Sequence, residues 1–183
     1  GLFAFMQEPK SRESLRVTLL KAHFSPEAQA SLSEQIAIND DAYTYSRELY
    51  EKSHQPLVQE IIDADRQKPV VRDQGFRRIV VSTYDHRCAL CGLRIITSEG
   101  HTAVDAAHIK PWSLSHNDDI RNGMALCKTC HWAFDKGMVG ISRDYNVITS
   151  RQIGTNTNVP GVLQTLAGRG ILPPKEKELW PSQ

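Results

Sequence analysis

The stretch "CKTCHWAFDKG", residues 127–137, places a histidine, His131, directly after the second of two cysteines, Cys130. If residues 128–136 form a helix, adjacent side chains diverge by about 100° around its axis. A Cys130 that turns toward a metal ion therefore leaves His131 aimed at a different place. The stretch predicts two sites that share one helix. A variant in which His131 replaces Cys130 as a ligand of the first ion remains an alternative.

A second cysteine pair precedes this stretch. Cys88 and Cys91 stand in "CALCG" with the same two-residue spacing, so the two pairs offer four thiolates for a tetrahedral zinc ion. Gly92 permits the tight turn of the first pair. The 35 residues between Cys91 and Cys127 exceed the loop of about 15–20 residues in a compact zinc ribbon, which indicates an insertion. The alternative is four reduced cysteines in a core.

Composition limits the class of protein. The chain has 183 residues, 40% of them apolar, which suits one compact α+β unit with a helical extension. No stretch approaches the roughly 18 consecutive apolar residues of a membrane span, and "GLFAFMQ" is too short for a secretory signal. Paired cysteines of the metal-binding type favour a reducing compartment, so we expect a cytoplasmic protein. Because the chain starts at Gly1, we also expect a further N-terminal domain in a longer protein.

Charge is unevenly distributed along the chain. Residues 1–65 carry 6 basic and 11 acidic side chains, residues 66–137 carry 11 and 7, and residues 138–183 carry 5 and 3. The middle segment is therefore the one suited to a polyanion, because clustered Lys and Arg displace counterions from phosphates. The alternative is a solvated surface with no such partner.

The first domain, residues 1–68, is expected to be helical and to serve dimerisation or substrate selection. Ser25 before Pro26 is a helix start signal, since serine caps the first turn and proline fits its first position. Residues 66–70 are typical of a linker. The expected helices cover residues 11–23, a segment from Pro26, and residues 42–65 with an interruption near 54–56.

The second domain, residues 69–150, begins with an expected helix over residues 73–84 that leads into the first cysteine pair. Its end, "MVGISRDYNVITS", alternates around a turn in the manner of a β-hairpin. The extension over residues 151–183 is rich in Gly, Pro, Asn and Thr, so we expect mostly loop and one short helix.

Three residues between and beside the cysteine pairs carry chemistry. His108 stands in "AAHIKPW", Asn122 in "RNGMALC" and His131 in "CHWAFDKG". In this order, and with the two cysteine pairs on either side, the motifs resemble those of the HNH endonucleases, the ββα-metal nucleases. More narrowly, they resemble the C-terminal HNH domain of predicted bacterial restriction endonucleases. The resemblance covers about residues 73–150. It implies an α+β fold in which zinc stabilises a ββα-metal module, with a helical N-terminal region and a C-terminal hairpin and loop extension.

Phosphodiester hydrolysis needs a deprotonated water, charge neutralisation at phosphorus and a stabilised leaving oxygen. Histidine titrates in the range that suits proton transfer, so His108 is the expected general base. His131 can hold a divalent cation against the phosphate, and Asn122 can bridge backbone groups that orient His108. Taken singly, these residues would more often be structural; their joint pattern favours catalysis. The family resemblance implies the same roles.

The second ligand of the catalytic metal is less clear. Many HNH enzymes carry Asp or His directly before the base, but this chain has Ala107. Asp105, three residues before His108, is the expected substitute, because an acidic residue recurs there in the family. A regular strand would place Asp105 and His108 on opposite faces, so this role needs a bulge or a strand end.

We therefore expect a metal-dependent DNA endonuclease of restriction type that uses Mg²⁺ or Mn²⁺, with Ni²⁺ or Zn²⁺ as alternatives, besides the structural zinc. The resemblance implies 5′-phosphate and 3′-hydroxyl products. One alternative is a non-catalytic, zinc-stabilised DNA-binding module; another is a nuclease toxin or anti-phage effector. A homodimer is a further expectation. Five basic residues flank the motifs and are candidates for phosphate contact: Arg87, Arg94, Lys110, Arg121 and Lys128. Trp132 and Phe134 are expected in the core.

Overall fold

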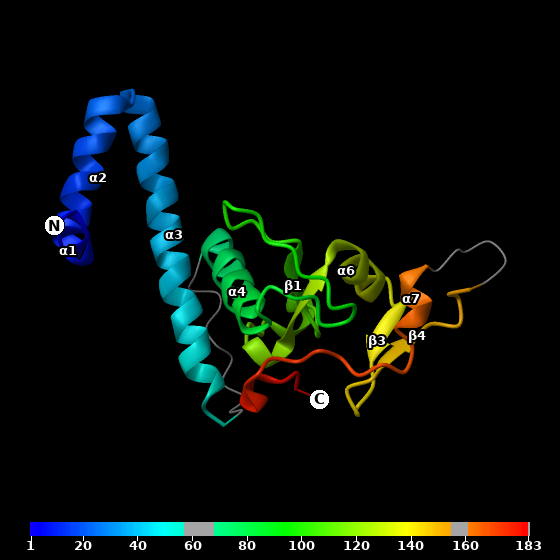
Figure 1. Ribbon diagram of the computed structural model, residues 1–183. Helices are drawn as coiled ribbons and strands as arrows, with labels where there is room; N and C mark the ends of the chain where they lie inside the picture. Colours follow the sequence, from blue (N-terminus) through cyan, green and yellow to red (C-terminus); the bar gives the residue numbers. More distant parts are fainter. Residues whose placement is uncertain (57–67, 155–160, 183) are drawn as a thin grey trace. The chain divides into compact units, whose positions relative to one another are not determined.

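The computed structural model describes residues 1–56, 68–154 and 161–182, and the chain is α+β. It forms two compact units, Gly1–Asp41 and Ala42–Gln183, and Figure 1 follows the chain through both. Along the chain, the division between the two units falls within α3 (Pro26–Ser53), whereas the sequence placed a domain boundary between residues 68 and 69. Part of the predicted helix 42–65 and of the predicted linker lies outside the described residues. Over the described residues, no helix combines the length and the apolar character that a membrane crossing requires.

The first unit consists of α1 (Leu2–Gln7), α2 (Pro9–His23) and the N-terminal part of α3. The two predicted helices are confirmed, and the Ser25 hydroxyl accepts a hydrogen bond from the Ala28 amide at 3.3 Å at the start of α3. Neither α1 nor α2 contains a buried residue. Surface helices of this kind gain little from their own packing, so their stability depends on local capping and ion pairs.

The second unit starts with the C-terminal part of α3, because that part packs on α4 (Pro69–Thr83). Tyr45 and Leu49 of α3 are buried, and so are Phe76 and Val80 of α4. Pro69 is the first residue of α4, where the backbone N–H that a proline lacks would have no partner within the helix. Pro69 therefore belongs to the helix and not to the predicted linker. The boundary between the two units therefore lies where the side chains of α3 become buried, and not where the composition of the sequence changes.

Gly75 of α4 lies where the helix comes close to α3. A Cβ at this position would lie 2.8 Å from the Tyr45 Cδ1 atom and 2.9 Å from the Ala42 carbonyl oxygen. Real Cβ atoms do not approach a backbone atom so closely, and a helix backbone cannot give way as a flexible side chain can. Glycine at this position therefore allows α3 and α4 to pack together.

We expect Gly75→Val to lower the free energy of unfolding by about 2–3 kcal/mol, because the added atoms overpack the α3–α4 contact. Urea denaturation followed by circular dichroism measures the loss. The control is Gly170→Val, since a Cβ at Gly170 would meet no atom closer than 4.0 Å. Equal midpoints for the two variants would show that α3 does not pack on α4 in this way.

The centre of the second unit is an antiparallel hairpin of β1 (Val104–His108) and β2 (Gly123–Cys127). Its register runs without a break from Val104 opposite Cys127 to His108 opposite Gly123. Helix α4 packs against this hairpin, and α6 (Lys128–Asp135) contacts it as well (Figure 1). The arrangement is a ββα unit in which the helix directly follows the second strand.

The connection between the strands contains two short elements, α5 (Trp112–Ser115) and η2 (Ile120–Asn122). After α6, the predicted hairpin is confirmed as β3 (Val139–Ile141) paired with β4 (Val147–Thr149). The rest is mostly loop with α7 (Val162–Thr165) and η3 (Lys177–Leu179), as predicted over the described part.

The C-terminal segment is bonded to the second unit at several points. The Leu172 amide donates to the Ala89 carbonyl at 2.8 Å, beside the first cysteine pair, and the Ser182 amide donates to the Arg121 carbonyl at 2.8 Å. Side-chain oxygens of Glu176 accept a hydrogen bond from the Tyr50 hydroxyl, at 3.0 Å for the shorter contact. Backbone bonds therefore make the extension part of the packed unit, although its composition alone suggests a loose tail.

Candidate metal centre and active site

The four cysteines gather into one cluster. Within the described residues they are the only group of three or more His, Cys, Asp or Glu whose ligand atoms lie close together, all within 4.8 Å of one another. The sulfur atoms of Cys91 and Cys127 are 3.7 Å apart. Four sulfurs at about 2.3 Å from a zinc ion in a tetrahedron are separated by about 3.8 Å. The predicted cluster is confirmed, and its geometry fits a tetrahedral ion.

The chemistry of the cluster also favours a cation. A hydrogen bond to Cys88 and burial raise the pKa of the Cys130 thiol, and burial raises the pKa of Cys91 to about 11. Four thiolates packed in a buried space repel one another, so the full set of ligands ionises only around a positive ion. Gly92 follows the first pair at φ 79°, the left-handed conformation that the sharp turn needs.

His108 is the last residue of β1, and two neighbours hold its ring. The Nε2 atom lies 2.7 Å from the Oδ1 atom of Asp118, a fully buried carboxylate in the connection between the strands. The Phe76 ring of α4 stacks on the imidazole, with centroids 4.0 Å apart and planes 6° from parallel. The side chain keeps 20% of its surface exposed, so it is fixed in position and still reaches solvent.

Asn122 joins the two ends of the connection between β1 and β2. Its Oδ1 atom accepts a hydrogen bond from the Lys110 amide at 2.9 Å, while Nδ2 donates to the carbonyls of Lys110 at 3.1 Å and Asn117 at 2.9 Å. The side chain is buried. Lys110 is two residues beyond His108, and Asn117 directly precedes Asp118. One amide thus tethers the segments that carry both members of the His108–Asp118 pair.

We expect Asn122→Ala to lower the cleavage rate about 10- to 100-fold, because three hydrogen bonds to backbone groups near His108 are lost and buried groups are left unpaired. Single-turnover cleavage measures the rate, and thermal unfolding monitors the fold. Asn39→Ala on the exposed surface of α3 is the matched control. A variant that cuts at the wild-type rate would exclude a positioning role for Asn122.

His131 lies on α6 directly after Cys130, and the helix separates the two side chains as the 100° step requires. Cys130 is buried in the cysteine cluster, whereas the His131 side chain is 25% exposed and its Nε2 atom lies 3.5 Å from the Asp135 Oδ2 atom. The alternative in which His131 takes the place of Cys130 in the cluster is not found, since all four cysteines gather.

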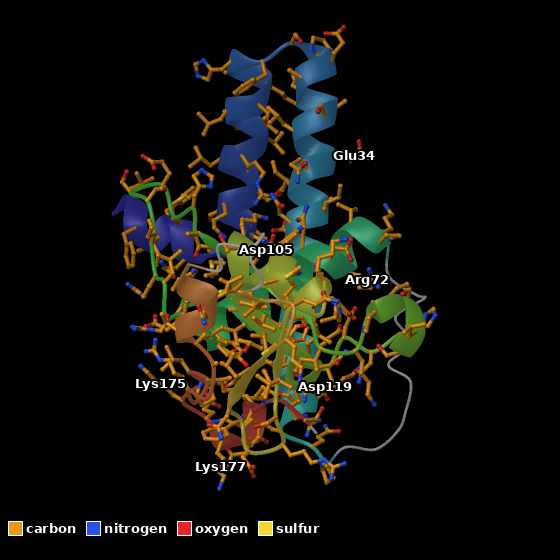
Figure 2. All side chains as sticks on the ribbon, turned by 90° about the vertical axis from the view of Figure 1, so that its right-hand side faces the viewer. Glu34, Arg72, Asp105, Asp119, Lys175 and Lys177 are labelled. Atoms are coloured by element: carbon orange, nitrogen blue, oxygen red, sulfur yellow. The ribbon has the colours of Figure 1, made fainter. Side chains whose placement is uncertain are left out.

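Asp105 lies in the regular part of β1, which contains no bulge. Its Oδ1 atom accepts a hydrogen bond from Arg77 Nε at 2.6 Å and its Oδ2 atom accepts one from Lys128 Nζ at 3.1 Å; Figure 2 labels this residue. Partial burial opposes ionisation, but the hydrogen bonds from Lys128 and Arg77 outweigh it and hold the pKa of Asp105 below its ordinary value. Lys128 precedes His131 by three residues, so the carboxylate approaches the helix face that carries His131.

The five basic candidates differ in their surroundings. Arg121 is largely buried and forms a two-point ion pair with Asp119 at 2.8 and 2.6 Å (Asp119 is labelled in Figure 2). Arg94 donates to the Asp85 carbonyl at 2.8 Å, and Lys128 binds Asp105. Arg87 and Lys110 are exposed.

Trp132 was expected in the core but is 54% exposed on α6, because Cys130 and Ala133 occupy the buried face of this helix. An exposed tryptophan on the helix after the second cysteine pair enlarges the surface that a partner can contact.

Sequence reasoning missed Asp118, Tyr45 and Arg72. The Tyr45 hydroxyl donates to the Asp118 Oδ2 atom at 3.1 Å, and Arg72 Nε lies 3.7 Å from the same oxygen. Asp118 is one of two adjacent aspartates in a polar loop, "HNDDI", and nothing in that pattern separates a buried base partner from a turn residue.

Residues 88–142 match a family model described as HNH endonuclease. The curated proteins contain no match to the chain. Among solved structures, one described as a modification dependent TagI restriction endonuclease is similar, with a TM-score of 0.41 and 23% sequence identity. The similarity covers 58% of this chain and 33% of that one. The chain thus matches about a third of the length of that protein.

Proposed function

Because residues 88–142 of this chain form an HNH endonuclease domain, we propose that the protein is a metal-dependent nuclease that hydrolyses phosphodiester bonds of DNA. The observation that carries the proposal is His108, an imidazole held at the end of β1 by a buried carboxylate and a stacked ring. Such a ring is oriented for one proton transfer, which is what a general base requires.

In this proposal the chain's own residues perform the proton transfer. His108 takes the proton of the attacking water on a ring nitrogen, and the Asp118 carboxylate lies 2.7 Å from the other side of the ring, at Nε2. Asn122 keeps the connection between the strands in place through its three backbone bonds. The leaving oxygen departs opposite the attacking water and must be stabilised as it gains charge.

His131 and Asp105 are the residues that would hold the catalytic cation. They supply an imidazole nitrogen and a carboxylate oxygen, a donor set that suits Mg²⁺ or Mn²⁺ and admits Ni²⁺ or Zn²⁺. When bound, such a cation polarises the phosphate and stabilises the leaving oxygen. To serve as the second ligand, Asp105 would have to release Lys128, which binds its Oδ2 atom, and β1 would have to depart from its regular, bulge-free register.

Further roles follow from the resemblance of the motifs to HNH domains of restriction endonucleases. We propose a restriction-type enzyme of the cytoplasm, with zinc in the cysteine cluster and with DNA as substrate. The helical N-terminal part would serve dimerisation or substrate selection. Arg87, Arg94, Lys110 and Lys128 are exposed and are therefore better placed for phosphate contact than Arg121, although Lys128 binds Asp105 and Arg94 binds Asp85.

The test is incubation of the full chain with supercoiled plasmid DNA and Mg²⁺ or Mn²⁺. We expect nicked and linear products, no cutting when EDTA is added, and ends that DNA ligase can rejoin, because the products carry 5′-phosphate and 3′-hydroxyl groups. DNA that shifts in a gel but is not cut with Mg²⁺, Mn²⁺, Ni²⁺ or Zn²⁺ would instead identify a zinc-stabilised DNA-binding module.

A further inference from the structure

The surroundings of Asp118 extend the site beyond the segment that matches the HNH family. Asp118 is buried completely, and its two oxygens have different partners. Oδ1 faces His108, while Oδ2 receives the hydroxyl of Tyr45 from α3 and approaches the guanidinium of Arg72 from α4. Both supporting residues lie outside residues 88–142.

We propose that Asp118 is the positioning residue of His108, that it fixes the ring as the Nε2–H tautomer, and that Tyr45 and Arg72 hold Asp118 in place. The proposal rests on the proposed function, since it assigns the proton-accepting atom of the general base. It makes the end of α3 and the start of α4 part of the catalytic unit.

The neighbours of Asp118 compensate for the burial of its carboxylate. A buried carboxylate is costly unless it is paired, and here Arg72 supplies a positive charge 3.7 Å away while Tyr45 and His108 supply hydrogen-bond donors. Burial, and then the charge of Asp118, raise the pKa of Tyr45 above its ordinary range, so the phenol keeps its proton and donates it. The carboxylate thus has donors on both oxygens.

Arg72 is itself held in a defined position. Its guanidinium carbon lies 3.7 Å from the centroid of the Trp112 ring, a cation–π contact, and another nitrogen donates to the Asp73 carboxylate. The side chain is only 11% exposed, and Figure 2 labels it on α4. Because its Nε and Nη1 atoms have no hydrogen-bond partner within the described residues, its orientation toward Asp118 is set by charge and by stacking.

Two consequences distinguish this arrangement from a structural ion pair. The tautomer of a neutral His108 should be Nε2–H, because a carboxylate at 2.7 Å from Nε2 cannot donate. An asparagine at position 118 can instead turn its amide group toward Nε2 and so favour the Nδ1–H tautomer. That tautomer carries its proton on the atom that should receive one from water.

The experiment combines Asp118→Asn with Tyr45→Phe in the full chain, and uses Asp144→Asn in the exposed β3–β4 turn as the matched control. We expect the single-turnover cleavage rate to fall about 10²- to 10⁴-fold in Asp118→Asn and about fivefold in Tyr45→Phe. DNA affinity, measured with Ca²⁺ in place of the active cation, should stay within about twofold of wild type in all three.

A second readout does not depend on activity. Nitrogen NMR of protein labelled with ¹⁵N-histidine, assigned by comparison with His108→Ala, reports which ring nitrogen carries the proton. We expect Nε2–H in the wild-type protein and a shift toward Nδ1–H in Asp118→Asn. An Nδ1–H tautomer in the wild type, or an unchanged tautomer and an unchanged rate in Asp118→Asn, would overturn the proposal. Wild-type protein that shows Nε2–H but cuts no DNA would refute the proposed function and leave the positioning of the ring supported.

Discussion

Replacement of His108 by alanine should lower the rate of DNA cleavage by about 10²- to 10⁴-fold, the usual contribution of a general base. The reason is geometric, because the ring is fixed between Phe76 and Asp118 at the end of β1. Single-turnover rates with excess enzyme isolate the chemical step from product release. Binding of DNA should change little, because the proposed role of His108 is in proton transfer.

Loss of the ring also leaves the buried Asp118 without one donor, so the fold of the variant must be checked. Thermal unfolding and DNA affinity with Ca²⁺ serve for this purpose, and His108→Gln, which retains a polar side chain, is a second variant. His101→Ala, a change of the same kind at an exposed position, is the matched control. If His108→Ala folds, binds DNA and cuts as fast as the control, His108 is not the base.

Replacement of Cys130 by serine should remove the metal ion of the cysteine cluster and unfold the second unit. Zinc contributes about 10–16 kcal/mol in zinc-finger peptides, while whole domains are stable by only about 5–15 kcal/mol. The cluster joins the turn at Cys88 and Cys91 to the junction of β2 and α6, so its loss separates the β1–β2 hairpin from that turn. Elemental analysis should find one zinc per wild-type chain and none per variant chain.

Circular dichroism should show the cooperative unfolding transition of the wild-type protein shifted to much lower temperature in Cys130→Ser, and a strong chelator should have the same effect on the wild type. Thr129→Ala, at the exposed neighbouring position of α6, is the control and should retain its zinc. Purified wild-type protein that contains no metal yet melts cooperatively would show that the cluster is a set of reduced core cysteines.

Local patterns explain what could be predicted from the sequence. Two Cys-x-x-Cys pairs specify a metal cluster wherever the chain brings them together, and the structure confirms the cluster. The helices and the second hairpin follow from periodicity and from turn residues such as Ser25 and Pro26, which act within a few residues. The roles of His108, Asn122 and His131 remain predictions, because they depend on chemistry and not on position alone.

Contacts between distant segments could not be predicted in the same way. The partners of Asp118 lie 10 residues away at His108 and 73 residues away at Tyr45. The periodicity of the sequence contains no sign of the contacts of Asp118 with His108 and Tyr45, and an aspartate in "HNDDI" is interpreted as a turn residue. The boundary at residue 68 was placed by composition for the same reason, whereas the burial of Tyr45 and Leu49 places the end of α3 in the second unit.

A crystal structure of the His108→Ala variant with a DNA duplex and Mn²⁺ would show, by anomalous scattering, where the catalytic cation binds relative to His131 and position 108. We expect a manganese ion bound by His131 and by an oxygen of one phosphate, with position 108 facing that same phosphate from the end of β1. A manganese ion bound away from His131, or DNA seated on a surface that position 108 does not face, would contradict this expectation.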